Sequence, residues 1–424
     1  MLSPLNFRDK LFYGWVVVVT FLILGTVIWG IRFSFGVFFK SIESEFNLTR
    51  AATSAIFSTQ MVLGGLFTIL GGWALDRYGP RIILLLMGIF TGFSLVLTSQ
   101  TNTLWQLFIT YSLLLAMGTS AIFVGVMSTV SRWFDRKRGL SMGIASSGAG
   151  LGPLVIAPFA TYLIANFDWR TAFIVMGLLA WLIVIPLSRL LKRDPYEIGA
   201  VPDGVKTPLK ATESEKNYVK IADLSLAQAF RTRSFWLVIF IFLLFASSLF
   251  LILTHLVPHA TDIGFSAVEA ATVLSVAGGA TIVGRLLLGI ASDRIGRKAA
   301  AITCTLLHAV AMVCLVQAQD LGTLYLFALL FGLGWGGMGP TMAAIIGDTF
   351  GLGKMGAILG VLDAGFSVGA AIGPVIGGLI FDVSHSYFLA FSLGAAVMLL
   401  ATLLITLIRR EKNRNLTGDE AKHV

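Results

Sequence analysis

Charged residues are scarce in this sequence: Asp, Glu, Lys and Arg make up 12% of its 424 residues, whereas soluble domains carry about 25%. So few charges cannot cover a surface that faces water, and the composition therefore excludes an ordinary soluble protein. Hydrophobic residues reach 56%, and the mean hydropathy is +0.87. These values predict a polytopic protein whose helices are embedded in a membrane.

Cysteine is also rare, and its two copies, Cys304 and Cys314, fall in one apolar stretch. We therefore expect neither a disulfide framework nor a metal site, and no cofactor. The sequence offers no nucleophile–base constellation and no sizeable polar domain, which disfavours a membrane enzyme or sensor. The net charge of +9 would suggest nucleic acid in a soluble chain, but here it indicates cationic loops on one side of a membrane.

Long apolar runs are abundant, and twelve are close to the length that crosses a bilayer. They cover approximately residues 12–39, 51–74, 81–99, 104–133, 139–165, 169–191, 234–261, 267–291, 299–318, 321–349, 355–382 and 386–408. One long polar stretch separates the sixth run from the seventh. The sequence thus predicts an all-α integral membrane protein with twelve transmembrane helices.

The distribution of Lys and Arg predicts the orientation. With both termini and the central polar stretch in the cytoplasm, 26 of the 31 cations lie inside, and only Lys40, Arg50 and Arg170 lie outside. Arg32 and Arg285 fall within apolar runs. Because cytoplasmic loops carry an excess of Lys and Arg, this asymmetry indicates cytoplasmic termini.

A ten-residue motif occurs twice, which predicts an internal repeat. Residues 72–81 (GWALDRYGPR) recur as residues 289–298 (GIASDRIGRK), a displacement of 217 positions. The same displacement aligns four glycines of the fifth run with four of the eleventh: Gly139, Gly143, Gly148 and Gly152 with Gly356, Gly360, Gly365 and Gly369. We infer two pseudo-symmetric six-helix halves, residues 1–192 and 234–410, joined by a cytoplasmic linker (193–233) that ends in a short helix, with a cytoplasmic tail (411–424). An even number of helices in each half gives both copies the same orientation.

The repeated loop pattern G-x-x-x-D-R-x-G resembles the signature of the major facilitator superfamily. Four further stretches resemble its bacterial monocarboxylate transporter branch, which neighbours the oxalate/formate antiporters. These stretches are residues 13–15 (YGW), 132–143, 284–289 and 351–381. The resemblance covers the chain except the linker and tail. It implies the major facilitator fold, with a central cavity that opens alternately to either side of the bacterial inner membrane.

Arg285 is the strongest candidate for a binding residue. It lies eight residues, roughly 12 Å along a helix, from the loop that carries Asp293. A charge at such depth is costly and often functional, and a guanidinium matches a carboxylate with two parallel hydrogen bonds. In the transporters that this chain resembles, an arginine of the eighth helix anchors the substrate carboxylate, and Arg285 is the matching position. The alternative is a structural arginine paired to a neighbour.

Asp363 is predicted at a similar depth in the eleventh helix, roughly 14 Å from its start. A carboxylate beside Arg285 would neutralise it and could carry a proton; the alternative is packing against polar neighbours. Arg32, expected near the outer end of the first helix, either attracts anions or reaches the head groups. His255 is a second candidate for the proton, with a structural hydrogen-bonding histidine as its alternative.

The repeated loops carry Asp76, Arg77, Asp293 and Arg294, which the resemblance implies act as conformational latches at the cytoplasmic helix ends. The proton-coupling aspartate that animal-type relatives carry one turn before the arginine is replaced here by Thr281. Another group, such as Asp363 or a histidine, then takes the proton, or it travels with the undissociated acid.

The resemblance implies a monomeric secondary transporter that moves a small monocarboxylate such as lactate or pyruvate together with a proton. Carboxylate exchange of the oxalate/formate type stays open as the alternative mechanism. The expected partners are the carboxylate, a proton and lipid, without nucleic acid.

Overall fold

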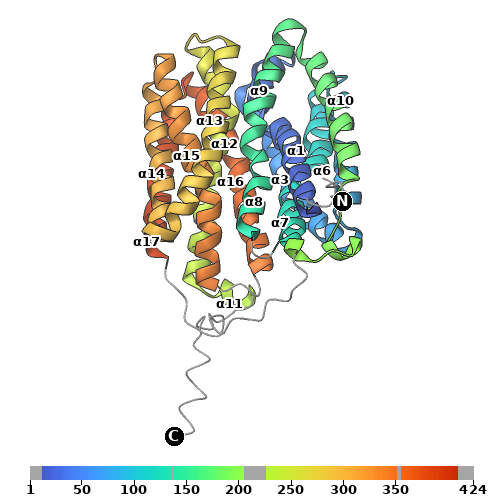
Figure 1. Ribbon diagram of the computed structural model, residues 1–424. Coiled ribbons are helices and arrows are strands. Elements are labelled where there is room, and N and C mark those ends of the chain that lie inside the picture. The colour runs from blue at the N-terminus through green and yellow to red at the C-terminus, as the bar shows by residue number, and fades with distance from the viewer. Residues whose placement is uncertain (1–11, 135–136, 205–225, 351–354, 409–424) are drawn as a thin grey trace, which may run out of the picture. The chain divides into compact units, whose positions relative to one another are not determined.

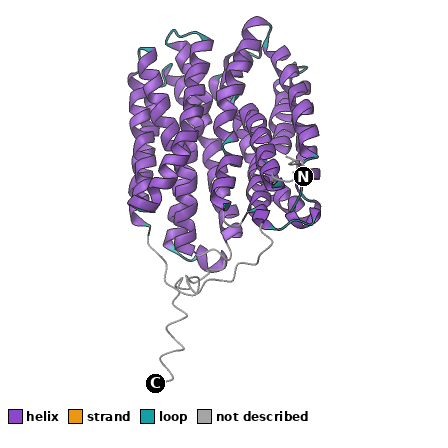
Figure 2. Cartoon of the chain, in the orientation of Figure 1, coloured by secondary structure: helices purple, strands orange, loops and turns teal. Residues whose placement is uncertain are grey.

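The structure is a computed structural model that describes residues 12–134, 137–204, 226–350 and 355–408. Every regular element in these ranges is a helix (Figure 2). Twelve helical segments are long and apolar enough to cross a membrane. Their positions confirm the all-α, twelve-span fold class.

The first six spans are built from α1 to α10 (Figure 1). Their bounds are α1 (Tyr13–Phe33), α2 (Phe35–Glu45), α3 (Arg50–Tyr78), α4 (Pro80–Thr98), α5 (Leu104–Leu107), the π-helix η2 (Phe108–Leu114), α6 (Leu115–Thr119), α7 (Ile122–Trp133), α8 (Arg138–Ser146), α9 (Gly148–Asn166) and α10 (Trp169–Ser188). Two short 3-10 helices follow, η3 (Pro195–Ile198) and η4 (Pro202–Gly204).

The last six spans come from α12 to α17, preceded by the short α11. Their bounds are α11 (Leu226–Phe230), α12 (Arg233–Asp262), α13 (Ala267–Ile295), α14 (Arg297–Gln317), α15 (Leu321–Phe350), α16 (Met355–Ser384) and α17 (Phe388–Leu407). Linker residues 205–225 and the tail from residue 409 lie outside the described residues.

The first span is longer than its apolar run predicts. Helix α1 ends at Phe33, where the Ser34 N–H bonds to the Gly30 carbonyl at 3.1 Å, and α2 continues the span to Glu45. The sequence-based end at residue 39 is therefore six residues short. Polar residues such as Lys40 hide this extension, because hydropathy falls before the helix ends.

The conserved spacing of the repeated loop has a backbone reason. Gly79, between α3 and α4, and Gly296, between α13 and α14, adopt φ values of +80° and +93°. An L-residue with a side chain is strained in this region, whereas glycine is not. Both copies of the motif therefore need their final glycine for the same sharp turn between two helices.

Two further helix starts are fixed by side-chain caps. The Asp168 carboxylate accepts the Thr171 N–H at 2.5 Å at the start of α10. This hydrogen bond is the main cause that lowers the pKa of Asp168 from its ordinary value of 3.8. The Thr232 hydroxyl accepts the Phe235 N–H at 3.2 Å and caps α12 in the same way.

The chain divides into two compact units. In unit 1, α1 packs on α9 and α4 packs on α10. In unit 2, α12 packs on α16, and α14 packs on both α15 and α17. Glycines of the repeat permit these contacts: a Cβ on Gly152 of α9 would lie 2.5 Å from the Gly30 nitrogen, and one on Gly369 of α16 would collide with the Leu243 carbonyl.

Two helices contribute to both units. The first residues of α3, within Thr49–Ser58, belong to unit 2, whereas the rest of α3 belongs to unit 1. Conversely, Gly264–Gly278, with the start of α13, belongs to unit 1, and the rest of α13 belongs to unit 2. The 217-residue displacement relates the two starts, since it maps residue 50 onto residue 267.

Candidate functional site

Arg285 lies in the middle part of α13, 18 residues after Ala267 and 10 before Ile295. Its side chain is half-buried. The helix crosses α15 closely here, because a Cβ on Gly336 would lie 2.8 Å from the Arg285 nitrogen. Thr281, one turn earlier, is 1% exposed. The structure thus places a guanidinium far from either helix end, at a tight crossing of two helices of unit 2.

Asp363 lies on another helix of the same unit, eight residues after the start of α16 at Met355. Its side chain is also half-buried. Both residues therefore belong to unit 2, within their helices and away from the helix ends. Their mutual neutralisation stays a prediction.

Arg32 lies deeper than the sequence indicates. Because the first span continues to Glu45, Arg32 is 13 residues from that end, which is about 20 Å of helix. Its guanidinium Nη2 contacts the Met61 sulfur at 3.0 Å. The same charge acts on the hydroxyl of Tyr111, a residue that is 2% exposed in η2. A π-helical turn of this kind occurs often at functional sites.

His255 is fully buried near the end of α12. Its Nε2 lies 2.8 Å from the Pro374 carbonyl oxygen and 3.2 Å from the Ser54 hydroxyl, and its Nδ1 lies 2.9 Å from the Tyr387 hydroxyl. A carbonyl oxygen only accepts, so Nε2 carries the proton of the neutral ring. Nδ1 is then the acceptor for the Tyr387 hydroxyl proton.

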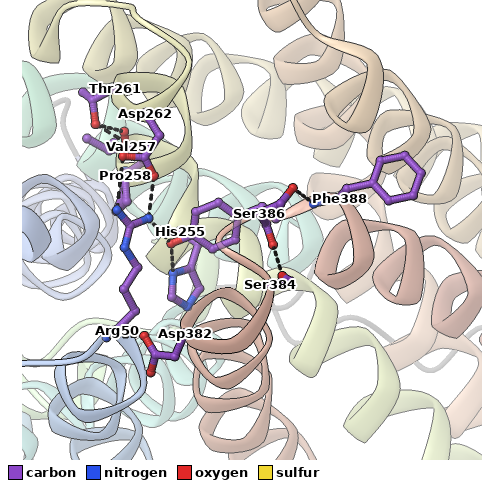
Figure 3. Close-up of polar contacts among 11 residues, drawn as sticks. Arg50, His255, Val257, Pro258, Thr261, Asp262, Asp382, Ser384, Ser386 and Phe388 are labelled. Carbon is purple, nitrogen blue, oxygen red and sulfur yellow. Dashed lines mark hydrogen bonds and ion pairs between the residues drawn. The ribbon is translucent and has the colours of Figure 1, made fainter.

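Arg50 is the residue that the sequence analysis missed, because its position before an apolar run suggested an outer-loop cation. It is 7% exposed. Figure 3 shows its guanidinium directed at Asp262, with hydrogen bonds of 2.6 and 3.1 Å to the two carboxylate oxygens. It also donates to the Tyr387 hydroxyl at 2.7 Å and lies 3.7 Å from the centroid of the Phe381 ring.

The backbone at the start of α3 is held as well. The Asp382 carboxylate accepts the N–H groups of Arg50 and Ala51 at 2.9 and 3.0 Å. These are donors that the helix itself leaves unsatisfied, at its positive end. Close backbone approach supports the contact, since a Cβ on Gly378 would lie 2.7 Å from the Ala51 Cα.

The residues predicted as latches are described only in part. Arg77 and Arg294 are exposed, and the Arg77 guanidinium lies 5.5 Å from the centroid of the Trp73 ring. The side chains of Asp76 and Asp293 lie outside the described residues. Arg297, from the second copy of the loop, forms an ion pair with Asp348 at the end of α15.

Twelve membrane-spanning helices in a 217-residue register, with an arginine in the middle of α13, define a polytopic membrane transporter. The family model described as "Major Facilitator Superfamily" matches residues 21–291 and 256–423. The chain belongs to that superfamily, and it is not an enzyme.

Similar curated proteins include monocarboxylate transporter 13 of Rattus norvegicus, which is 27% identical over 93% of this chain and 89% of the relative. Monocarboxylate transporter 11 of Homo sapiens is 26% identical over 91% and 81%. These matches confirm the resemblance to the monocarboxylate transporters.

Among solved structures, a bacterial homologue of the human lysosomal transporter Spinster, in an inward-facing and unoccupied conformation, aligns with a TM-score of 0.65. It is 15% identical, and the alignment covers 96% of both chains. At this identity the likeness concerns the fold alone, and it agrees with the predicted major facilitator architecture.

Proposed function

We propose that this protein is a secondary transporter that moves a small monocarboxylate, of the lactate or pyruvate type, together with a proton by alternating access. The observation that carries the proposal is the similarity to monocarboxylate transporters over nine-tenths of the chain. The position of Arg285 in the middle of α13 supports it, because a monocarboxylate needs one cationic partner within the membrane.

In the proposed mechanism, Arg285 binds the substrate carboxylate through two parallel hydrogen bonds. Arg32, the second cation within a span, attracts the anion toward unit 1. Asp363 is a candidate for the transported proton, since an acid in the same unit as Arg285 responds electrostatically to an incoming anion. His255 is the other candidate, because it is buried and hydrogen-bonded through both ring nitrogens.

The transporter is proposed to be a monomer in the bacterial inner membrane, with both termini and the linker in the cytoplasm. The excess of Lys and Arg in the corresponding loops supports this orientation. The start of α3 and the end of α12 then face the outside, and we call this side the outer side. The six-helix halves, residues 1–192 and 234–410, rock against each other, and Asp76, Arg77, Asp293 and Arg294 latch the cytoplasmic side.

Uptake into proteoliposomes tests the function directly. Purified protein is reconstituted, and entry of radiolabelled lactate or pyruvate is followed with and without an inward proton gradient. Symport predicts uptake that the gradient drives and that Arg285→Ala abolishes. Uptake that requires carboxylate on the opposite side, regardless of the proton gradient, would instead identify an exchanger. Absence of flux with every small monocarboxylate would refute the proposal.

A further inference from the structure

We propose that the contacts at the start of α3 form a gate on the outer side of the transporter and that a proton on His255 opens it. The gate consists of Arg50, Asp262, Tyr387 and His255. This inference deepens the proposed function, because it assigns a site at which proton binding changes access to the substrate path.

The shape of α3 requires contacts that can break. Helix α3 is continuous from Arg50 to Tyr78 and contains no proline, yet its first residues belong to unit 2 and its remainder to unit 1. A rigid helix cannot follow both units when they move relative to one another. Alternating access must therefore bend α3 or release its first turn. The contacts of that turn are polar and at a helix end, where water can replace each of them once they separate.

The internal repeat shows that this contact is specialised. The 217-residue displacement maps Asp262 onto Glu45 and Tyr387 onto Arg170. Within unit 1, Arg170 binds Glu45 at 2.9 Å, so the acid at the end of the first span is neutralised by an arginine of the same half. In the second half, tyrosine replaces that arginine, and Asp262 is neutralised by Arg50 of α3. The second half thus depends on a cation from the other half of the sequence.

Hydrogen-bond directions connect His255 to this contact. Arg50 donates to the Tyr387 oxygen at 2.7 Å, and the Tyr387 hydroxyl donates its proton to Nδ1 of His255 at 2.9 Å. Protonation of Nδ1 converts it from an acceptor into a donor. The Tyr387 oxygen would then face two cationic donors, and the hydroxyl could no longer bond to the ring. Closing the gate and protonating His255 are therefore antagonistic.

The charges around His255 support this direction. From α3 the positive Arg50 opposes an imidazolium, whereas Asp382 of α16 favours it. On α12 itself, Asp262 is already engaged by Arg50, and His259 packs its ring edge-on against Tyr387, 5.6 Å between centroids. When the start of α3 departs, Arg50 leaves with it and Asp382 stays. Proton binding and gate opening then stabilise each other by reciprocal linkage.

The gate is tested by distance measurement with spin labels on the full chain in lipid nanodiscs. Cys304 and Cys314 are replaced by Ser, and labels are attached at Asn102 of the α4–α5 loop, in unit 1, and at Val383 of α16, in unit 2. On acidification from pH 8 to 6 the population with the longer distance should grow. One proton allows the open-to-closed ratio to rise by up to about tenfold per pH unit.

Two variants separate the gate from a merely structural cluster. Tyr387→Phe removes the hydroxyl that joins His255 to Arg50 but keeps the ring, and His255→Gln removes the titrating group. Each should flatten the pH response. His308→Gln is the matched control, because His308 is also fully buried in unit 2 and bonded to a serine hydroxyl; it should keep the full response.

A parent protein whose distances ignore pH, or a full response in both Tyr387→Phe and His255→Gln, would overturn the gate. The measurement needs no substrate, so its outcome is independent of the transport assay. A normal pH response without carboxylate flux refutes only the proposed substrate. Proton-driven carboxylate flux with distances that ignore pH refutes only the gate.

Discussion

Arg50 and Asp262 form a two-point ion pair across 212 positions of the sequence, with one oxygen of the carboxylate for each of two guanidinium nitrogens. The arginine side chain is 8% exposed and the aspartate 26%. This geometry fixes the orientation of both groups, which a single contact would not. It also locates a sizeable electrostatic contribution at one point of the structure.

Loss of one partner should destabilise the protein measurably. Asp262→Asn leaves a nearly buried guanidinium without its counter-charge, at a cost of about 1–4 kcal/mol, between the values typical of exposed and buried pairs. The double variant Arg50→Gln/Asp262→Asn should be more stable than the sum of the single losses implies. Thermal unfolding in detergent, arranged as a double-mutant cycle, measures the coupling; additive losses would show that the pair contributes little.

Arg285→Lys should impair transport severely although the charge is kept. A lysine ammonium cannot offer the planar fork that binds both carboxylate oxygens, and we expect a loss of about tenfold or more in kcat/KM, equivalent to one lost charge-assisted hydrogen bond. Initial rates of lactate uptake give the value. Arg77→Lys, an exposed arginine on α3, serves as the control for general effects of the substitution. Normal kinetics in Arg285→Lys would remove Arg285 from the binding site.

Asp363→Asn should weaken the dependence of uptake on external pH. The amide cannot take up a proton in the pH range of the assay, so the coupling between anion and proton is lost if Asp363 carries the proton. We expect anion binding to strengthen, because Arg285 no longer shares a unit with a competing negative charge. Uptake rates between pH 5.5 and 8 measure the effect. A full pH dependence in this variant would assign the proton to His255 or to the substrate itself.

The cap of α10 predicts a pH effect on stability. The folded protein lowers the pKa of Asp168, so its contribution is complete above the ordinary value of 3.8 and is lost as the pH falls through the lowered value. Asp168→Ala should cost about 1 kcal/mol at neutral pH. Asp168→Asn keeps a capping oxygen without a titrating group and should remove only the acid dependence. Unfolding midpoints at pH 7 and pH 3.5 provide the comparison; equal midpoints for Asp168→Ala and the parent at pH 7 would contradict the cap's role.

The proposed orientation predicts that a cysteine at Lys216 in the linker is protected in intact cells. A membrane-impermeant maleimide should label it only after the membrane is permeabilised, since the linker is expected in the cytoplasm. A cysteine at Val383, on the proposed outer side, is the positive control. Labelling of Lys216→Cys in intact cells would reverse the topology.

The sequence predicts the spans well for a physical reason. Each helix must fill the thickness of the bilayer with apolar residues, so its length and bounds are written in a continuous segment. The 217-residue register carries this further, because α15 (Leu321–Phe350) maps exactly onto the span Leu104–Trp133. Arg285 could be singled out for the same reason, since a charge within such a segment is conspicuous.

Pairs between distant helices could not be predicted in this way. Arg50 and Asp262 each stand at a helix end, where charges are ordinary, and nothing local indicates that they meet. Their contact depends on how each helix is rotated about its axis, which hydropathy does not record. A usable signal did exist: the repeat aligns Asp262 with Glu45 but Tyr387 with Arg170, which predicts that Asp262 needs a cation from elsewhere.

The exchange of helix starts between the two units has a consequence for how the chain could be divided. If the protein were expressed as two fragments cut within residues 205–225, each fragment would carry a segment that completes the other: Thr49–Ser58 in one, Gly264–Gly278 in the other. Such fragments are complementary in the manner of a domain-swapped pair. The covalent linker is then dispensable for assembly, and co-expressed fragments should recover a working transporter where either fragment alone does not.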